Sequence, residues 1–346
     1  MKQIYLATIL FLLAQTSFSQ KIYFAKANYE DSILLEKNIP ALAKQTLVFY
    51  KERDQSAFID NAYRLQLLAA QYDAVNTSLK QLSFIDLKDS VTPNALGFPY
   101  QMYTAVLAAG ATTDNFTSTY NTIFQKKYNA FNDDNKIWVT EYFDNSLDDY
   151  RTKLQSIIKE YKKSDSLSVT EAVKLCKSYL TYKTYARTQP LAKALLQKFE
   201  NEKYIVQDSV IIKMPDGGSI ALTIVRSRKN DIPLPVILKY NIYAGKDITT
   251  CKDAVTRGYI GVVANTRGKR LSPDVTEPFE HDAKDAYYII DWISKQPWCN
   301  GKVGMYGGSY LGFSQWSAVK YLHPALKTIV PQVSVGVGID YPAHNS

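Results

Sequence analysis

A serine in a glycine-rich turn is the residue of this sequence best suited to covalent chemistry. Ser309 follows Gly307 and Gly308, and residues 302–316 read as a short apolar strand, a tight turn and a helix. Such a turn projects the serine hydroxyl from the end of a strand, where it can attack an acyl carbonyl. Small residues are needed because a side chain on the neighbouring turn would clash, and Gly312 adds further room. The segment therefore predicts a serine nucleophile.

The helix expected from Tyr310 onward would place its positive end and its free backbone N–H groups beside Ser309. An oxyanion formed at that position would be stabilised. The general pattern for such turns is G-x-S-x-G. Here Leu311 stands where the second glycine is expected, and Gly312 follows it. A glycine loop followed by an ordinary helix is the alternative interpretation of these residues taken alone.

The elements that must position Ser309 begin after Tyr204, where the spacing of apolar residues changes from helical to alternating. Asp216 and Gly217 lie between two β-branched runs and predict a hairpin. Three strands then follow, each with a helix after it: 236–238 with a helix ending near 258, 259–264 with a helix over 282–295, and 303–306 with a helix over 310–321. With the two hairpin strands these make five, and residues 326–333 are expected to form a sixth. This order predicts an α/β class and an α/β-hydrolase sheet with Ser309 after its fifth strand.

Residues 20–203 have a different character. Apolar residues recur at helical spacing, and signals for strands or hairpins are scarce, so we expect an α-helical domain of antiparallel helices. Acidic and basic residues would lie on its exposed faces, and we identify no catalytic residue there. The chain of 346 residues is long enough for two domains, 20–203 and 204–346.

Residues 1–19 have the pattern of a secretory signal peptide. A positive start precedes an apolar run over 4–14, and Ser17 and Ser19 are the small residues that signal peptidase reads. The apolar run is too short to span a bilayer comfortably. We therefore expect cleavage after Ser19 and a secreted or periplasmic protein with no membrane anchor afterwards.

The charge and the metal-binding side chains exclude several functions. The formal charge of +8 is spread thinly, with no long basic run, which argues against nucleic-acid binding. Cys176, Cys251 and Cys299 are far apart and odd in number, so at most one disulfide could form. Neither the cysteines nor the three histidines have metal-ligand spacing. We predict no metal site.

The segment from about Asp208 to Asp340 resembles the X-prolyl dipeptidyl-peptidase and cocaine-esterase family of serine hydrolases, which also includes glutaryl acylases. The motifs that carry the resemblance are MPDGG at 214–218, PVILKYNIY at 235–243, NTRG at 265–268, Asp285 with WI at 292–293, and QPWCNGKVGM at 296–305 leading into GGSYLG at 307–312. The family's turn is G-x-S-Y-x-G, which accounts for the displaced glycine. Asn265 stands where the family usually has Asp, at a position outside its catalytic groups.

The resemblance implies a role for individual residues. Ser309 would be the nucleophile, and the backbone N–H of Tyr310 and the hydroxyl of Tyr243 would hold the oxyanion. Arg267 and Asp285 would be structural, satisfied by local partners and by the helix dipole. The helical domain lies outside the resemblance.

No histidine of this sequence is an obvious general base. His323 comes fourteen residues after Ser309, which puts it on the order of 20 Å away along a helix. His281 precedes the nucleophile, whereas triads of this fold run Ser, Asp, His. Asp340 and His344 follow the sixth strand, before a seventh or eighth strand could be built. We therefore expect an incomplete sheet of about six of eight strands, from a longer enzyme whose Asp and His lie further along the chain.

The sequence thus predicts an exported serine hydrolase that cleaves a peptide, amide or ester bond through an acyl-enzyme at Ser309, and residues 1–346 alone are expected to be inactive. Serine acyl transfer implies no organic cofactor. The expected partner is a small peptide, acyl-amide or ester substrate, and the oligomeric state is open. The alternative is a non-catalytic binding protein, in which the helical domain docks a partner and the hydrolase part is a remnant.

Overall fold

The computed structural model describes residues 20–89 and 92–336, and these form two compact units. The first unit comprises the described residues up to Phe124 together with Asn145–Gln189. The second takes Gln125–Asp144 and everything described from Pro190 onward. The predicted signal peptide, Asp340 and His344 lie outside the described residues.

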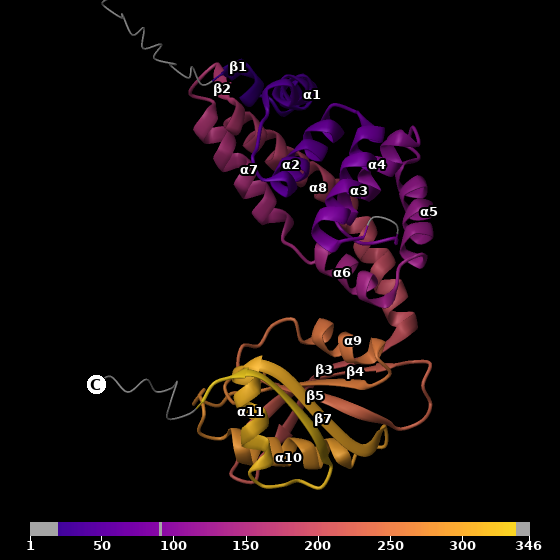
Figure 1. Cartoon of the computed structure of the whole chain (residues 1–346), viewed down its shortest axis with the longest axis vertical. Coiled ribbons are helices and arrows are strands. Elements are labelled where there is room, and N and C mark those ends of the chain that lie inside the picture. The colour runs from indigo at the N-terminus through magenta and orange to yellow at the C-terminus, as the bar shows by residue number, and fades with distance from the viewer. Residues whose placement is uncertain (1–19, 90–91, 337–346) are drawn as a thin grey trace, which may run out of the picture. The chain divides into compact units, whose positions relative to one another are not determined.

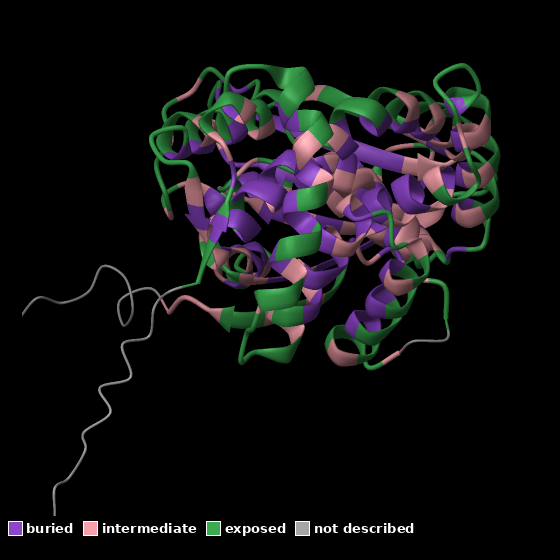
Figure 2. Ribbon diagram, turned by 90° about the horizontal axis from the view of Figure 1, so that it is seen from above, coloured by how far each residue is buried: buried purple, intermediate pink, exposed green. Residues whose placement is uncertain are grey.

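The first unit is mostly helical, as the apolar spacing predicts. Its helices are α1 (Ser32–Phe49), α2 (Gln55–Leu68), α3 (Tyr72–Leu87), α4 (Phe98–Ala108) and α7 (Leu147–Tyr161), with the first parts of α5 (Phe116–Asn129) and α8 (Val169–Lys203) (Figure 1). Side-chain caps begin several of them: Asp31, Asp54 and Ser146 each accept a hydrogen bond from a backbone N–H of the first turn. Exposed residues lie along outer helix faces and in loops (Figure 2).

The expectation of an all-helical region is wrong in one detail. A short strand β1 (Lys21–Tyr23) pairs antiparallel with β2 (Ser166–Ser168), and a 3-10 turn, η1 (Lys26–Tyr29), follows β1. Ile22 and Leu167 oppose each other in this pair, and both are buried in the core of the unit. Three-residue strands are too short to show an alternating pattern in the sequence.

The end of α8 and the helix α6 (Asp133–Phe143) belong to the second unit. The buried Lys252 forms an ion pair with Glu200 of α8, and Lys203 pairs with Asp133 at 2.6 Å. The boundary between the two compact units therefore lies inside α8 and not at the change from helix to strand. The predicted division at residue 204 marks the change of secondary structure, and as a domain boundary it stays a prediction.

The second unit is built on a six-stranded mixed sheet. Its strands are β3 (Tyr204–Lys213), β4 (Ser219–Ser227), β5 (Leu234–Asn241), β6 (Ile260–Asn265), β7 (Cys299–Ser309) and β8 (Leu326–Ser334), in the spatial order β3-β4-β6-β5-β7-β8. The pairs β3–β4 and β4–β6 are antiparallel, whereas β6, β5, β7 and β8 run parallel. The predicted sheet, with Ser309 at the end of its fifth strand in chain order, is confirmed.

The hairpin between β3 and β4 turns where the sequence predicts it. Gly217 has φ of 92°, and the N–H of Met214 donates to the carbonyl of Gly218 at 2.7 Å. The Asp216 side chain accepts from the N–H of Gly218. A residue with a Cβ adopts such a φ only at a cost, which explains the glycine at this position.

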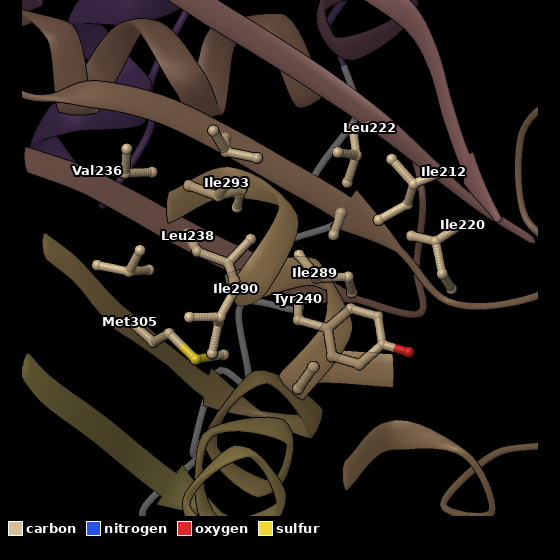
Figure 3. Close-up of a cluster of buried hydrophobic side chains, with 14 of the residues drawn as sticks. Ile212, Ile220, Leu222, Val236, Leu238, Tyr240, Ile289, Ile290, Ile293 and Met305 are labelled. Carbon is tan, nitrogen blue, oxygen red and sulfur yellow. The ribbon is translucent and has the colours of Figure 1, made fainter. Parts of the chain in front are cut away.

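Helices cover both faces of the sheet. On one face, Val236, Leu238 and Tyr240 of β5 pack in one core cluster with Ile289 and Ile290 of α10 (Asp282–Ser294), as Figure 3 shows, and α11 (Tyr310–Val319) also contributes to this cluster. On the other face α9 (Asp247–Thr256) packs with Cys251 and Val255 against Val225 and Val263. Alternate strand residues thus serve opposite faces, which is why this sheet is apolar on both. The three cysteines are free and buried.

Arg267, just after β6, joins the hairpin to α10. Its guanidinium donates to both oxygens of Asp285, at 2.8 and 2.6 Å, and to Asp216 at 2.8 Å. The Asp285 side chain is 1% exposed. The expectation that Arg267 and Asp285 are satisfied by local partners is confirmed.

Replacing Arg267 by methionine is expected to lower the free energy of unfolding by about 3–5 kcal/mol, because Asp285 would keep a buried charge without a positively charged partner. Urea unfolding of the purified chain measures it. The matched control is Lys295→Met, whose partner is Asp291 and whose side chain is 70% exposed; that change should cost less than about 1 kcal/mol. Equal, small losses in both variants would contradict a structural role for Arg267.

Candidate active site

Ser309 lies at a sharp turn from β7 into α11. The strand ends at Ser309 and the helix begins at Tyr310, as predicted. Ser309 has φ of 56° and ψ of −121°, a backbone conformation that is sparsely populated by residues other than glycine. Such strain persists only where the surrounding structure over-determines it, and it is common at functional sites. Ser309 therefore lies at the end of the strand, and the residue is exposed.

The glycines around Ser309 allow the close approach of α11 to its neighbours. A Cβ on Gly307, whose φ is 145°, would lie 2.7 Å from Cβ of Leu311. A Cβ on Gly312 would lie 2.9 Å from Cα of Ser334 in β8. A glycine three residues after the serine is therefore required by the close passage of α11 beside β8.

A buried glutamine stabilises the turn through hydrogen bonds. Gln315 of α11 donates through Nε2 to the carbonyl of Gly307 at 3.1 Å, and its Oε1 accepts from the N–H of Val330 at 2.8 Å. Gln315 is 1% exposed. One side chain thus links the strand before the nucleophile, the helix after it and the next strand. No sequence pattern points to this residue, because a glutamine one and a half turns into a helix is usually solvated.

Tyr243 reaches Ser309 from the neighbouring strand. Its hydroxyl oxygen lies 3.5 Å from Oγ of Ser309, at the outer limit for a hydrogen bond and longer than the usual O–H···O distance of about 2.5–3.0 Å. Tyr243 follows the end of β5, which pairs parallel with β7, so the carboxyl ends of the two strands bring together residues 66 positions apart. Asn241 accepts from the N–H of Tyr243 at 2.9 Å and fixes the loop.

The predicted oxyanion donors therefore flank the predicted nucleophile. The N–H of Tyr310 is in the peptide directly bonded to Ser309, at the N-terminus of α11, where backbone dipoles favour negative charge. The Tyr243 hydroxyl lies on the side of β5. The catalytic roles of Ser309, Tyr243 and Tyr310 stay predictions, and what the structure adds is their proximity.

The side chain of Tyr310 has a partner that the sequence did not reveal. Its hydroxyl donates to the carboxylate of Asp282, with both oxygens at 2.9 Å, and accepts from the N–H of Phe279 at 3.3 Å. Tyr310 and Asp282 are 4% and 3% exposed. Burial raises the pKa of the Asp282 carboxyl to about 6, although the hydrogen bond from Tyr310 opposes this effect. Burial and the neighbouring Asp282 both raise the pKa of Tyr310.

The raised pKa of Asp282 predicts a pH dependence of stability. Between pH 4 and pH 6 the folded state binds a proton at this carboxyl that the unfolded state, with a pKa of 3.8, has already lost. Stability from this group is therefore full below pH 4 and falls as the pH rises through 6, by about 3 kcal/mol at about 1.4 kcal/mol per pKa unit.

Asp282→Asn removes this titration while keeping a hydrogen-bond acceptor for Tyr310. Urea unfolding at a series of pH values between 4 and 8 should show the variant gaining on the wild type by about 3 kcal/mol as the pH rises. A stability difference that is constant with pH would show that Asp282 titrates normally in the folded chain.

Each of the two described histidines lies beside a carboxylate outside the predicted site. Nε2 of His281 lies 2.9 Å from Glu277, in the loop before α10. His323 is buried, with its ring against Tyr287 and its Nε2 3.6 Å from Asp291. The sequence-based exclusion of both as partners of the serine agrees with these contacts.

Metal-binding clusters and membrane-spanning helices are both absent from the part of the chain that the structure describes. Within residues 20–89 and 92–336, no cluster of three or more His, Cys, Asp or Glu could hold a metal ion. Among the same described residues, no helix combines the length and the apolar character needed to cross a bilayer.

Comparison with known proteins identifies relatives of the second unit. Residues 216–345 match the family model described as X-Pro dipeptidyl-peptidase (S15 family). The chain is 36% identical over 138 residues to cocaine esterase from Rhodococcus sp. (strain MB1 Bresler), which covers 38% of this chain and 24% of the esterase. It is 26% identical over 160 residues to Xaa-Pro dipeptidyl-peptidase from Lactobacillus helveticus (strain DPC 4571), covering 42% and 18% of the two chains.

A solved structure, a CocE/NonD family hydrolase from Staphylococcus aureus, is 26% identical with a TM-score of 0.34 over 36% of this chain and 27% of that one. The chain spans about a quarter or less of the length of the curated relatives it matches. The motifs, the order of the strands and the matched relatives agree for the same stretch of sequence. Residues 216–345, less than half of the chain, therefore match the X-Pro dipeptidyl-peptidase (S15) family and are similar to hydrolases of that kind.

Proposed function

We propose that this protein is a serine hydrolase that cleaves an ester, amide or peptide bond through an acyl-enzyme at Ser309. The observation that carries the proposal is the strained backbone of Ser309 at the β7–α11 turn, with the Tyr243 hydroxyl 3.5 Å from its Oγ. The match of residues 216–345 to the S15 family supports the same chemistry, since the matched relatives are an esterase and a dipeptidyl-peptidase by name.

The proposed reaction has two halves. Oγ of Ser309 attacks the acyl carbonyl and gives up its proton to a base, and the carbonyl oxygen becomes an oxyanion between the N–H of Tyr310 and the hydroxyl of Tyr243. The leaving alcohol or amine departs with that proton, and water then attacks the acyl-enzyme by the same route to release the acid and restore Ser309.

We place the base outside the described residues, because His281 and His323 both have other partners. His344 and histidines of a longer chain are then the candidates. We further propose that residues 1–346 alone turn over no substrate. If a purified 346-residue chain hydrolyses an ester and His344→Ala abolishes that activity, the proposed inactivity is overturned and His344 is the base.

A fluorophosphonate probe tests the proposed function, because it labels only a serine that is activated as a nucleophile. The protein expressed from its own gene should be labelled, and peptide mapping should locate the label on Ser309. Ser309→Ala is the matched negative control. An unlabelled, folded protein would refute the hydrolase and leave the alternative, a non-catalytic binding protein.

Export is a separate proposal, which rests on the sequence of residues 1–19. The mature protein should begin at Gln20 and be found outside the cytoplasm. Intact-mass measurement of the protein recovered from the producing cells decides it, and a chain that still carries Met1 would exclude signal cleavage.

A further inference from the structure

A buried hydrogen-bonded pair lies directly behind the nucleophile turn. Tyr310 is the residue after Ser309, and its hydroxyl is held by both carboxylate oxygens of Asp282 and by the N–H of Phe279. Asp282 is the first residue of α10, so its backbone belongs to a helix that packs on the sheet core. Because Tyr310 and Asp282 are buried, a hydroxyl with three polar contacts has little freedom to move here.

The ring of Tyr310 also supports the second predicted oxyanion donor. Its centroid lies 6.4 Å from that of Tyr243 in an edge-to-face arrangement, and 5.1 and 5.6 Å from those of Phe279 and Phe313. The contacts with Tyr243 and Phe313 are edge-to-face, an arrangement that is favourable and directional. One side chain therefore touches the tyrosine that reaches Ser309, while its own backbone N–H is the other donor.

The strain at Ser309 requires such an anchor. A φ of 56° at Ser309 is maintained only if the residues on either side are fixed. Gln315 holds Gly307 on the strand side, through the hydrogen bond to its carbonyl. On the helix side, Asp282 holds Tyr310.

We propose that Asp282 is a positioning residue for the reaction, which fixes the Ser309–Tyr310 peptide and the Tyr243 ring by holding the Tyr310 hydroxyl. The proposal rests on the proposed function and deepens it. Asp282 touches neither the substrate nor the reacting atoms, so its effect is on the alignment of the two oxyanion donors. Misplacement of such groups by an ångström or less lowers turnover by up to about 100-fold.

The experiment compares Asp282→Ala, Tyr310→Phe and the double variant with the wild type, in the protein expressed from its own gene. Each single change is expected to lower kcat for an activated ester by about 10- to 100-fold with KM nearly unchanged. The rate of fluorophosphonate labelling should fall with kcat, since phosphonylation uses the same donors. Because both changes remove the same interaction between Tyr310 and Asp282, the double variant should be no slower than the worse single variant.

Two further variants separate alignment from stability. Asp282→Asn keeps an acceptor for the Tyr310 hydroxyl and should restore kcat to within about threefold of the wild type. Tyr306→Phe is the matched control: Tyr306 lies three residues before Ser309 on β7, and its hydroxyl donates to Asp253 at 2.9 Å. It should lower the melting temperature much as Tyr310→Phe does, but leave kcat unchanged.

The outcomes distinguish the two proposals. If Ser309 of the folded wild type does not react with the probe, the proposed function fails, and the positioning role fails with it. If Ser309 reacts but Tyr310→Phe and Asp282→Ala are no slower than Tyr306→Phe, the hydrolase stands and the positioning role is wrong. Should Asp282→Ala not fold, Tyr310→Phe against Tyr306→Phe gives the same decision.

Discussion

Replacing Ser309 by alanine is expected to lower kcat for an activated ester by about 10⁴- to 10⁶-fold in the protein expressed from its own gene, the usual loss when the nucleophile of a serine hydrolase is removed. Alanine removes the Oγ that would form the acyl-enzyme and leaves the oxyanion donors in place. The residual rate, which those donors and substrate binding supply, should remain above that of the reaction in water. Steady-state kinetics with purified wild type and variant provide the measurement.

The matched control for this change is Ser317→Ala. Ser317 lies on the same helix, α11, about two turns beyond Ser309. The same atoms are removed there, away from the strained turn, so kcat should stay within twofold of the wild type. Equal activity of Ser309→Ala and wild type would mean that another residue carries the chemistry.

Tyr243→Phe is expected to lower kcat by about 10²- to 10³-fold, the usual effect of deleting one oxyanion donor. The hydroxyl lies 3.5 Å from Oγ of Ser309, and a distance of this length in a chain without substrate can shorten as the oxyanion forms. Because Tyr243 is 62% exposed, the loss of its hydroxyl should cost little stability. Kinetics and thermal melting of the same preparation separate the two effects.

Tyr259→Phe provides the comparison for Tyr243→Phe. Tyr259 is an exposed tyrosine just before β6, at the amino end of the parallel strands, whereas Ser309 and Tyr243 lie at their carboxyl ends. It should retain full activity. If Tyr243→Phe is equally active, Tyr243 is a packing residue, and the second donor to the oxyanion must come from elsewhere.

The sequence by itself determined the features that depend on neighbours along the chain. The turn at Ser309, the hairpin at Asp216 and Gly217, and the alternation of strands and helices all rest on spacings of two to four residues. Both the steric needs of a turn and the periodicity of an element act over that range. Residue types and spacings alone therefore predict each of these features, and the folded chain contains all of them.

Only the tertiary structure decided which distant residues meet. The sequence identified Tyr243 through its family, but the 3.5 Å approach to Ser309 follows from the parallel pairing of β5 with β7. Asp282 shows the limit more clearly: as an acid at the start of a helix it is an ordinary residue, and its bond to Tyr310 depends on how α10 and α11 pack on the sheet. Side chains 28 positions apart become partners through packing, which no local spacing encodes.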